Sequence, residues 1–266
     1  MSADPALKIH YRGQQREHTL SRSERARQIL FGDASAIEPS LLASSSRLGL
    51  SLETVAPEWS LTVQMFISQY VTFLKNSKWV SQRTLDDVCA QMTNLVSGYS
   101  FWAFLLAMAQ HYGLPSAGLD VTSSVDVALY FALTGFEQDP HTPHLQRTKR
   151  LNTTDQYSVI YIFSNTERFL IDFSRIRPIG FPTARPDAQS AHFLHTGWGL
   201  ARNAVAERLF LALYLDRSYD WGPLPETSTM FPGPGKDVFG SFLHEAILKG
   251  GSSEFSEFMQ RFYWAT

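Results

Sequence analysis

The sequence predicts an α+β fold, with the whole chain, residues 1–266, forming a single domain. Two segments have the pattern of β-strands: Leu7–Gln14 alternates apolar and polar residues, and Tyr157–Phe163 is rich in β-branched and aromatic residues. Between them, residues 59–110 have mainly helical spacing, which predicts a large helical insert. Strands and helices that occur in separate runs are typical of the α+β class.

The first half of this insert predicts two helices. Trp59–Asn76 has the spacing of a long buried helix, and the residues near that spacing are Leu61, Met65, Ile67 or Ser68, Val71 or Thr72, and Leu74. A second helix is expected at Arg83–Val96, with Cys89 on its apolar side. Because Cys89 is the single cysteine, the chain has no internal disulfide and no thiolate metal cluster, and we expect a buried structural thiol.

A central stretch, Phe101–Phe136, places polar residues between two apolar segments. The nine apolar residues Phe101–Ala109 predict a buried helix, and Val125–Leu133 predicts another. Between them lies the short polar segment Leu119–Ser124, which contains one carboxylate and three hydroxyl groups. Buried polar groups need hydrogen-bond partners. The segment therefore predicts either a hydrogen-bonded helix cap or a ligand site.

The pattern is less decisive elsewhere. Gln138–Asp155 is polar and contains prolines, which predicts a loop, and Asp220–Asp237 holds four prolines and predicts another. His192–Leu200 is ambiguous, and Ala204–Asp216 fits either a helix or a buried strand. One or two amphipathic helices are expected in Phe239–Trp264.

Composition and missing motifs argue against non-specific binding to nucleic acid, against membrane insertion, and against the commonest nucleotide hydrolases, serine hydrolases and metalloproteases. A formal net charge of -2 gives no bulk attraction to nucleic acid or anionic lipid. No signal peptide and no apolar run of the ~20 residues needed to cross a bilayer are found, so we expect a soluble, cytoplasmic protein without a membrane partner. The sequence has no phosphate-binding Gly-rich loop, Gly-x-Ser-x-Gly elbow or His-Glu-x-x-His zinc helix. His141 and His144 have no further ligands nearby, and no metal site is expected.

Several ordered motifs resemble those of the FRG domain family. They are Tyr11–Gln14 for the Phe-Arg-Gly motif, Glu38–Leu41 for a Pro-Ser-Leu segment, Ala109–Pro115 with Leu119–Ser124 and Ala128–Ala132 for the central signature, and Arg185–Gln189 for a later Arg-x-x-Ala-Gln element. The chain departs from the family at Ser116-Ala117, where Thr-Arg is usual, and at Val121, where Trp is usual. The missing positive charge at Ala117 leaves Arg12 as the candidate for phosphate contact.

FRG domains in turn resemble the arginine-serine-glutamate branch of the ADP-ribosyltransferases. This resemblance implies a core with a split mixed β-sheet and NAD as the substrate. It also implies a set of residues that bind NAD: Arg12, Gly13, Tyr112, Thr122, Ser123 and Ser124. Breaking the nicotinamide–ribose bond passes through an oxocarbenium-like species, so the enzyme must hold the pyrophosphate and stabilise positive charge on the sugar. Arg12 offers a bidentate donor to phosphate.

The carboxylate that would complete such a site is less evident. Gln189 lies where the third motif is expected, but an amide carries no negative charge. The candidate catalytic residues are therefore Gln189, Asp120 and His111, with Glu207 and Glu245 as further carboxylates. Structural alternatives exist: Asp120, Thr122 or Ser123 could cap the following helix, and His111 with Tyr112 could end the preceding one.

The resemblance implies a bacterial toxin or anti-phage effector, controlled by an antitoxin or chaperone partner, that modifies RNA, DNA or protein. Basic residues in the ranges 16–27 and 147–150 slightly favour nucleic acid as the target, although such stretches are usually solvated surfaces. The alternative is a catalytically inert FRG module that binds a nucleotide or a partner protein. A nuclease is disfavoured because no acidic metal cluster is evident.

Overall fold

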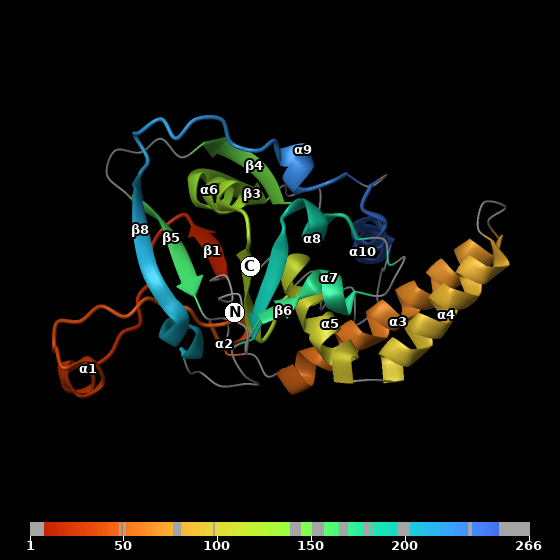
Figure 1. Cartoon of the computed structure of the whole chain (residues 1–266), viewed down its shortest axis with the longest axis horizontal. Helices are drawn as coiled ribbons and strands as arrows, with labels where there is room; N and C mark the ends of the chain where they lie inside the picture. The colour runs from red at the N-terminus through yellow and green to blue at the C-terminus, as the bar shows by residue number, and fades with distance from the viewer. Residues whose placement is uncertain are drawn as a thin grey trace, which may run out of the picture.

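The computed structural model describes residues 8–47, 49, 52–76, 81–97, 99–138, 145–150, 157–164, 170–177, 181, 183–195, 203–233 and 236–249. Its centre is a six-stranded sheet in the order β6-β7-β2-β1-β5-β8 (Figure 1). These strands are β1 (Ile9–Gln14), β2 (Gly118–Thr122), β5 (Tyr157–Ser164), β6 (Leu170–Asp172), β7 (Ala191–His195) and β8 (Leu209–Asp216). The α+β class and the strands predicted near Leu7–Gln14 and Tyr157–Phe163 are confirmed.

All neighbouring strands of this sheet run antiparallel, so the expected mixed sheet is wrong for the described strands. Strand direction depends on how distant segments connect, and side-chain alternation does not report it. Within this one continuous sheet, the pairing between β1 and β2 is short. β1 pairs with β5 over six residues, from Ile9 to Gln14, but with β2 only at Tyr11 and Thr122. We call this narrow junction between β1 and β2 the seam.

The helices expected in residues 59–110 are present, and the first of them starts earlier than predicted. They are α3 (Leu52–Asn76), α4 (Gln82–Ser97) and α5 (Tyr99–His111). Figure 1 shows α3 and α4 side by side, extending away from the sheet. The predicted buried face of α3 is wrong in part: Leu61 and Met65 are 55% and 51% exposed, whereas Ile67 is buried and Val71 and Leu74 pack against the core. Cys89 is half-buried, contrary to the fully buried thiol that the sequence predicted.

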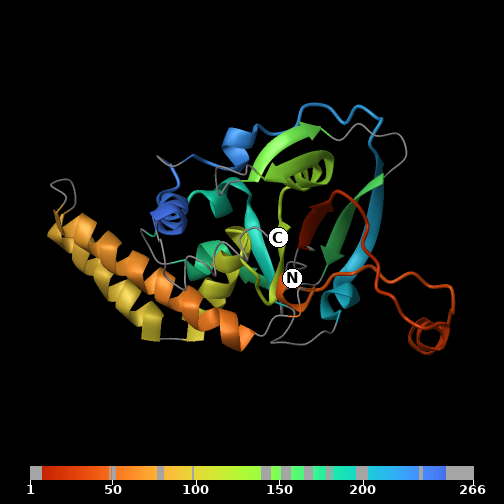
Figure 2. The same cartoon turned by 180° about the vertical axis from the view of Figure 1, so that it is seen from behind.

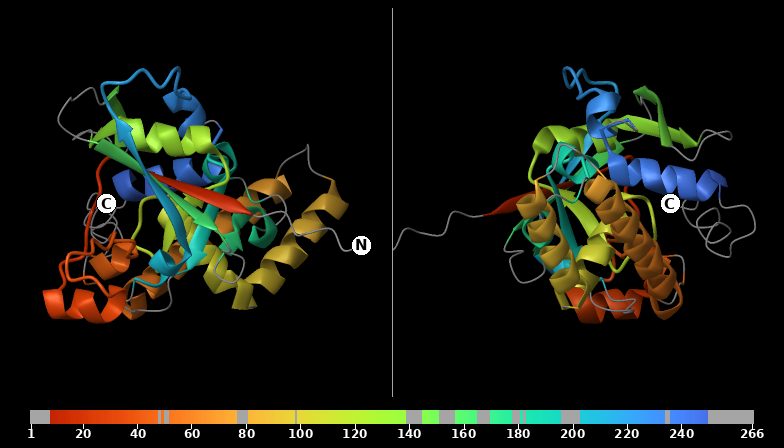
Figure 3. Two further views of the ribbon diagram at one scale, coloured as in Figure 1. Left: turned by 60° about the vertical axis from the view of Figure 1, so that its left-hand side comes forward. Right: turned by 90° about the vertical axis from the view of Figure 1, so that its right-hand side faces the viewer.

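The main hydrophobic core lies between this insert and the sheet. Trp59, Val63 and Phe66 of α3 are buried with Phe104 of α5 and with Phe239, the second residue of α10 (Val238–Lys249). A smaller cluster forms where α6 (Val125–Leu133) packs against β1 and β5, as Figure 3 shows. The bounds of α6 match the prediction. The sheet is therefore covered by α5 near β2 and β7 and by α6 near β1 and β5.

The remaining elements settle the ambiguous segments. The predicted loop Gln138–Asp155 is wrong in part, because β3 (Thr134–Gln138) and β4 (Leu145–Arg150) form a two-stranded sheet. The strand alternative holds for most of Ala204–Asp216, after the short 3-10 helix η1 (Ala204–Arg208). Short helices are α1 (Glu24–Phe31), α2 (Ser44–Arg47), α7 (Phe173–Ile176), α8 (Arg185–Ala188) and α9 (Thr227–Met230). Residues 250–264 of the predicted C-terminal helices lie outside the described residues. None of the described helices is both long and apolar enough to cross a membrane.

Candidate functional site

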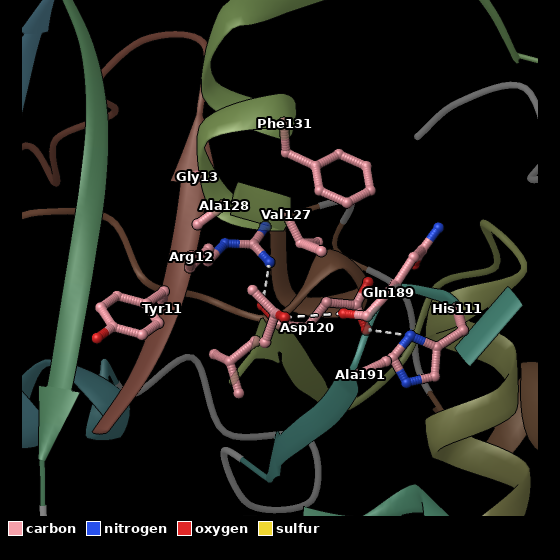
Figure 4. A pocket seen from close by; sticks show the side chains of 12 residues that line it. Tyr11, Arg12, Gly13, His111, Asp120, Val127, Ala128, Phe131, Gln189 and Ala191 are labelled. Carbon is pink, nitrogen blue, oxygen red and sulfur yellow. Dashed lines mark hydrogen bonds and ion pairs between the residues drawn. The ribbon is translucent and has the colours of Figure 1, made fainter. Parts of the chain in front are cut away.

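A cavity of about 160 Å³ lies at the seam, beneath α6 (Figure 4). Its lining comes from β1, β2, the end of α5, α6, the turn after α8, and β7. The lining residues are Tyr11, Arg12, Gly13, His111, Asp120, Val121, Thr122, Val127, Ala128, Phe131, Gln189 and Ala191. Six of the nine predicted site residues are therefore brought together here: Arg12, Gly13, His111, Asp120, Thr122 and Gln189.

Gly13 allows β1 to pass directly beneath α6. A Cβ atom at this position would lie 1.8 Å from the backbone oxygen of Ala128 and 2.8 Å from the backbone nitrogen of Ala132. Only a residue without a side chain fits at that distance. The two residues of the Arg-Gly pair thus differ in position, because Gly13 brings the strand against the helix while the side chain of Arg12 lines the pocket.

Arg12 bridges the two halves of the sheet across the seam. Its Nη1 donates a 2.7 Å hydrogen bond to the backbone oxygen of Asp120, while its buried Nε has no hydrogen-bond partner. Burial lowers the pKa of Arg12 to about 10, an effect that the charge of Asp120 partly offsets. The guanidinium is therefore still a cation at neutral pH, with one donor unused.

His111 and Asp120 face each other across the pocket (Figure 4). The His111 Nδ1 atom lies 3.1 Å from Asp120 Oδ1, and the histidine side chain is 1% exposed while that of the aspartate is 35% exposed. The contact lacks hydrogen-bond angles, so both ring nitrogens of His111 are buried without a hydrogen-bond partner. Burial lowers the pKa of His111, and the nearby charge of Asp120 only partly opposes this effect. The lowered pKa favours a neutral imidazole.

The end of β2 is organised as a helix cap with one buried hydroxyl. Thr122 Oγ1 donates to the backbone oxygen of Gln189 at 2.8 Å and accepts from the backbone nitrogen of Ser124 at 3.0 Å. Ser124 Oγ caps α6 by accepting from the nitrogen of Val127, so the cap is neither Asp120 nor Ser123. Ser123 is exposed, and neither Ser123 nor Ser124 lines the pocket.

The FRG domain model matches residues 8–141, which is half of the chain. The chain belongs to the FRG domain family. No curated protein and no solved structure matches it. The matched region contains Arg12, His111, Asp120 and Thr122, and it ends before Gln189.

Tyr112, although adjacent to His111 in the FRG signature, has a packing role. It is fully buried outside the pocket lining, and its hydroxyl lies 2.8 and 2.9 Å from the two carboxylate oxygens of Asp237. The guanidinium of Arg185 lies 4.7 Å from the centre of its ring. Arg185 also donates to the backbone oxygen of His111 at 3.3 Å. Arg185 therefore holds the end of α5, a positioning role that the sequence analysis did not assign.

Gln189 lines the pocket, but its side-chain amide is already hydrogen-bonded within the protein. Its Nε2 donates to the backbone oxygen of Met230 at 3.0 Å, and its own backbone oxygen holds Thr122. Glu207 lies in η1, outside the pocket lining. Glu245 lies in α10, and its side chain is outside the described part of the chain. Asp120 is thus the carboxylate that lines the pocket.

Six pocket residues escaped the sequence analysis as site residues: Tyr11, Val121, Val127, Ala128, Phe131 and Ala191. Phe131 and Tyr11 belong to motifs of the FRG signature, and that membership was the available signal. Ala191 carried no signal, because β7 was not predicted. The departure at Ala117 has a simple explanation: the side chain is 1% exposed within the main core, away from the pocket. No group of three or more potential metal ligands occurs among the described residues.

Proposed function

We propose that this FRG domain protein is an NAD-dependent ADP-ribosyltransferase that modifies a macromolecular target. The observation that carries the proposal is the buried guanidinium of Arg12, which lines the pocket with its Nε unpartnered. A buried cationic donor without an acceptor is costly, and a ligand phosphate would satisfy it with a charge-assisted hydrogen bond. The pyrophosphate of NAD has this chemistry.

The order of elements supports the same proposal. Arg12 and Gly13 lie on β1. The hydroxyl residues Thr122–Ser124 run from the last residue of β2 to the N-cap of α6. This is the order expected for the arginine-serine-glutamate branch, and the short pairing of β1 with β2 leaves room for a pocket between these two strands. The resemblance to this branch implies a mixed sheet, whereas all neighbouring strands in the six-stranded sheet of this protein are antiparallel. The strand directions therefore differ from those that the resemblance implies.

Asp120 is the group we propose to stabilise positive charge on the ribose. Its carboxylate is partly exposed to the pocket, whereas the amide of Gln189 carries no charge and is bound to Met230. Negative charge fixed beside a developing oxocarbenium ion lowers the barrier to cleavage of the glycosidic bond. Neutral His111, beside Asp120, is placed to accept a proton from the attacking group of the target.

The cavity has a volume of about 160 Å³. Typical ligand sites are larger, at roughly 300–1,000 Å³. It can enclose one part of a dinucleotide, so the remainder of NAD would extend beyond its mouth. The hydrophobic ring of Phe131 offers a surface for the part that is enclosed.

The test is incubation of the purified chain with NAD labelled on the adenylate, together with RNA, DNA or cell extract in separate reactions. Transfer of label to one class identifies the target, and release of nicotinamide reports bond cleavage without a target. We expect Arg12→Ala and Asp120→Asn to abolish both signals. Ser21→Ala, which changes an exposed hydroxyl outside the pocket and outside these motifs, is the matched control and should retain them.

The alternative function is a catalytically inert FRG module that binds a nucleotide. The engaged amide of Gln189, at the place expected for the third motif, favours it. Calorimetry separates the two: NAD binding that requires Arg12, without label transfer or nicotinamide release, supports the inert module. Absence of both binding and turnover would refute both functions.

We further propose a toxin or anti-phage role, with an antitoxin or chaperone as partner. Induced expression in bacteria should arrest growth, and the Arg12→Ala variant expressed at the same level should not. Equal growth with both proteins would remove the toxin role while leaving the enzymatic proposal to the NAD assay.

A further inference from the structure

The outer edge of the sheet at β8 carries a cluster of exposed apolar side chains. Four of them lie within β8 itself: Phe210 is 68% exposed, Leu211 47%, Leu213 43% and Tyr214 50%. Figures 1 and 2 show β8 on the side of the molecule opposite the arm formed by α3 and α4, with α1 and its connecting loops extending beyond it. Among the described strands, β8 pairs only with β5 and leaves its other side open.

This edge lacks most of the features that protect edge strands from pairing. Such strands are usually short, charged, interrupted by proline or covered. The opposite edge strand, β6, follows that rule with three residues, whereas β8 has eight. No charged or proline residue occurs from Leu209 to Leu215. The pairing irregularity opposite Ile162 and Phe163 is confined to the beginning of β8, so most of the strand is regular.

The charges that flank this apolar segment favour a second copy of the same chain. Arg208 precedes the strand and Asp216 ends it, and Ala212 lies midway between them. Two identical strands that pair antiparallel about a two-fold axis at Ala212 place the Arg208 end of each beside the Asp216 end of the other. The same arrangement brings Phe210 of one strand near Tyr214 of the other, an aromatic pairing that stabilises sheets.

We propose that the protein forms a homodimer by antiparallel pairing of β8 with β8 of a second copy. The two six-stranded sheets become one continuous sheet, and the backbone groups on the open side of β8 gain hydrogen-bond partners. The small side chain of Ala212 lets the strands approach at the axis. The proposal is independent of the chemistry at the pocket, because no residue of β8 lines it.

Sedimentation velocity of the full chain over a range of concentrations tests the dimer. We expect a monomer–dimer equilibrium for the wild type and a monomer for Phe210→Lys, which places a charge at the most exposed position of the strand. Leu61→Lys is the matched control: Leu61 is 55% exposed on α3, at the other end of the molecule, and this variant should still dimerise. Thermal unfolding establishes that each variant is folded.

A charge exchange tests the antiparallel arrangement. Arg208→Asp and Asp216→Arg each place like charges together, and we expect each to weaken dimerisation about tenfold. The double exchange restores opposite charges and should recover the wild-type dimerisation constant. A wild-type chain that is monomeric at every concentration, or a dimer unaffected by Phe210→Lys, would overturn the proposal. Asp216 also accepts hydrogen bonds from Ser218 of its own chain, so the unfolding of each variant is compared with the wild type. A double variant that unfolds like the wild type but dimerises as weakly as the single variants would overturn the antiparallel register.

Discussion

Replacing Gly13 by alanine tests whether the contact between β1 and α6 holds the site together. The added Cβ would lie 1.8 Å from the Ala128 oxygen, whereas such atoms essentially never approach within 3.0 Å, so strand and helix must separate by about 1.2 Å. The obstruction is backbone on both sides, so no side-chain rotation relieves it. We expect a loss of about 3 kcal/mol in the free energy of unfolding, at the upper end of the usual cost of overpacking.

Thermal unfolding provides the assay, and a loss of this size should lower the melting temperature by roughly 6–12 °C. Gly233→Ala is the control, because a Cβ there meets no atom of the described residues within 4 Å, and it should melt close to the wild type. Separating β1 from α6 also widens the pocket, so NAD binding should weaken in Gly13→Ala and persist in Gly233→Ala. Equal melting temperatures for the two variants would refute the reasoning.

Three further predictions concern the surroundings of the pocket. Tyr112→Phe removes a hydroxyl from the buried carboxylate of Asp237 and should cost about 1–3 kcal/mol of stability in denaturant unfolding, without weakening NAD binding. Burial lowers the pKa of His111 below its ordinary 6.5, so the folded state resists a proton that the unfolded chain accepts. The contribution of His111 to stability should therefore be full above its ordinary pKa of 6.5 and should be lost as the pH falls from there toward the lowered pKa of the folded state. The fall should be shallower in His111→Asn. Arg185→Met removes the cation from the face of Tyr112 and should cost about 1–2 kcal/mol of unfolding free energy, with weaker NAD binding because the end of α5 loses its support.

The helices could be predicted from sequence, but the buried side of α3 between Trp59 and Phe66 could not. Its apolar residues form more than one stripe, because Leu61 and Met65 have the same helical spacing as Trp59, Val63 and Phe66. Trp59, Val63 and Phe66 are the buried set. They pack with aromatic residues from distant parts of the chain, including Phe181 and Phe239, which both contact Phe66. Local periodicity shows that a helix is amphipathic or apolar, whereas the choice between two apolar stripes depends on tertiary contacts.

The site residues were predictable as motifs, but not their orientations. His111 lines the pocket while Tyr112, the next residue, points into the core toward Asp237. Thr122 is buried at the pocket while Ser123 is exposed. Successive side chains point in different directions along both helices and strands, so adjacent residues of one motif divide between binding and packing. A motif therefore predicts the place of a site more reliably than each residue's role.

The seam gives Arg12 two tasks that a lysine cannot perform together. β1 and β2 share one residue pair there, and Nη1 of Arg12 adds a link by binding the Asp120 backbone oxygen while Nε stays open. A guanidinium has several donors in a fixed fork, whereas an ammonium is a single point of charge. Arg12→Lys should therefore keep the link, with a loss of about 1 kcal/mol of unfolding free energy. Binding of NAD should nevertheless weaken by about tenfold or more, as measured by calorimetry. If Arg12→Lys binds NAD as tightly as the wild type, the open donor does not contact the ligand, and the phosphate assignment fails even though the seam remains intact.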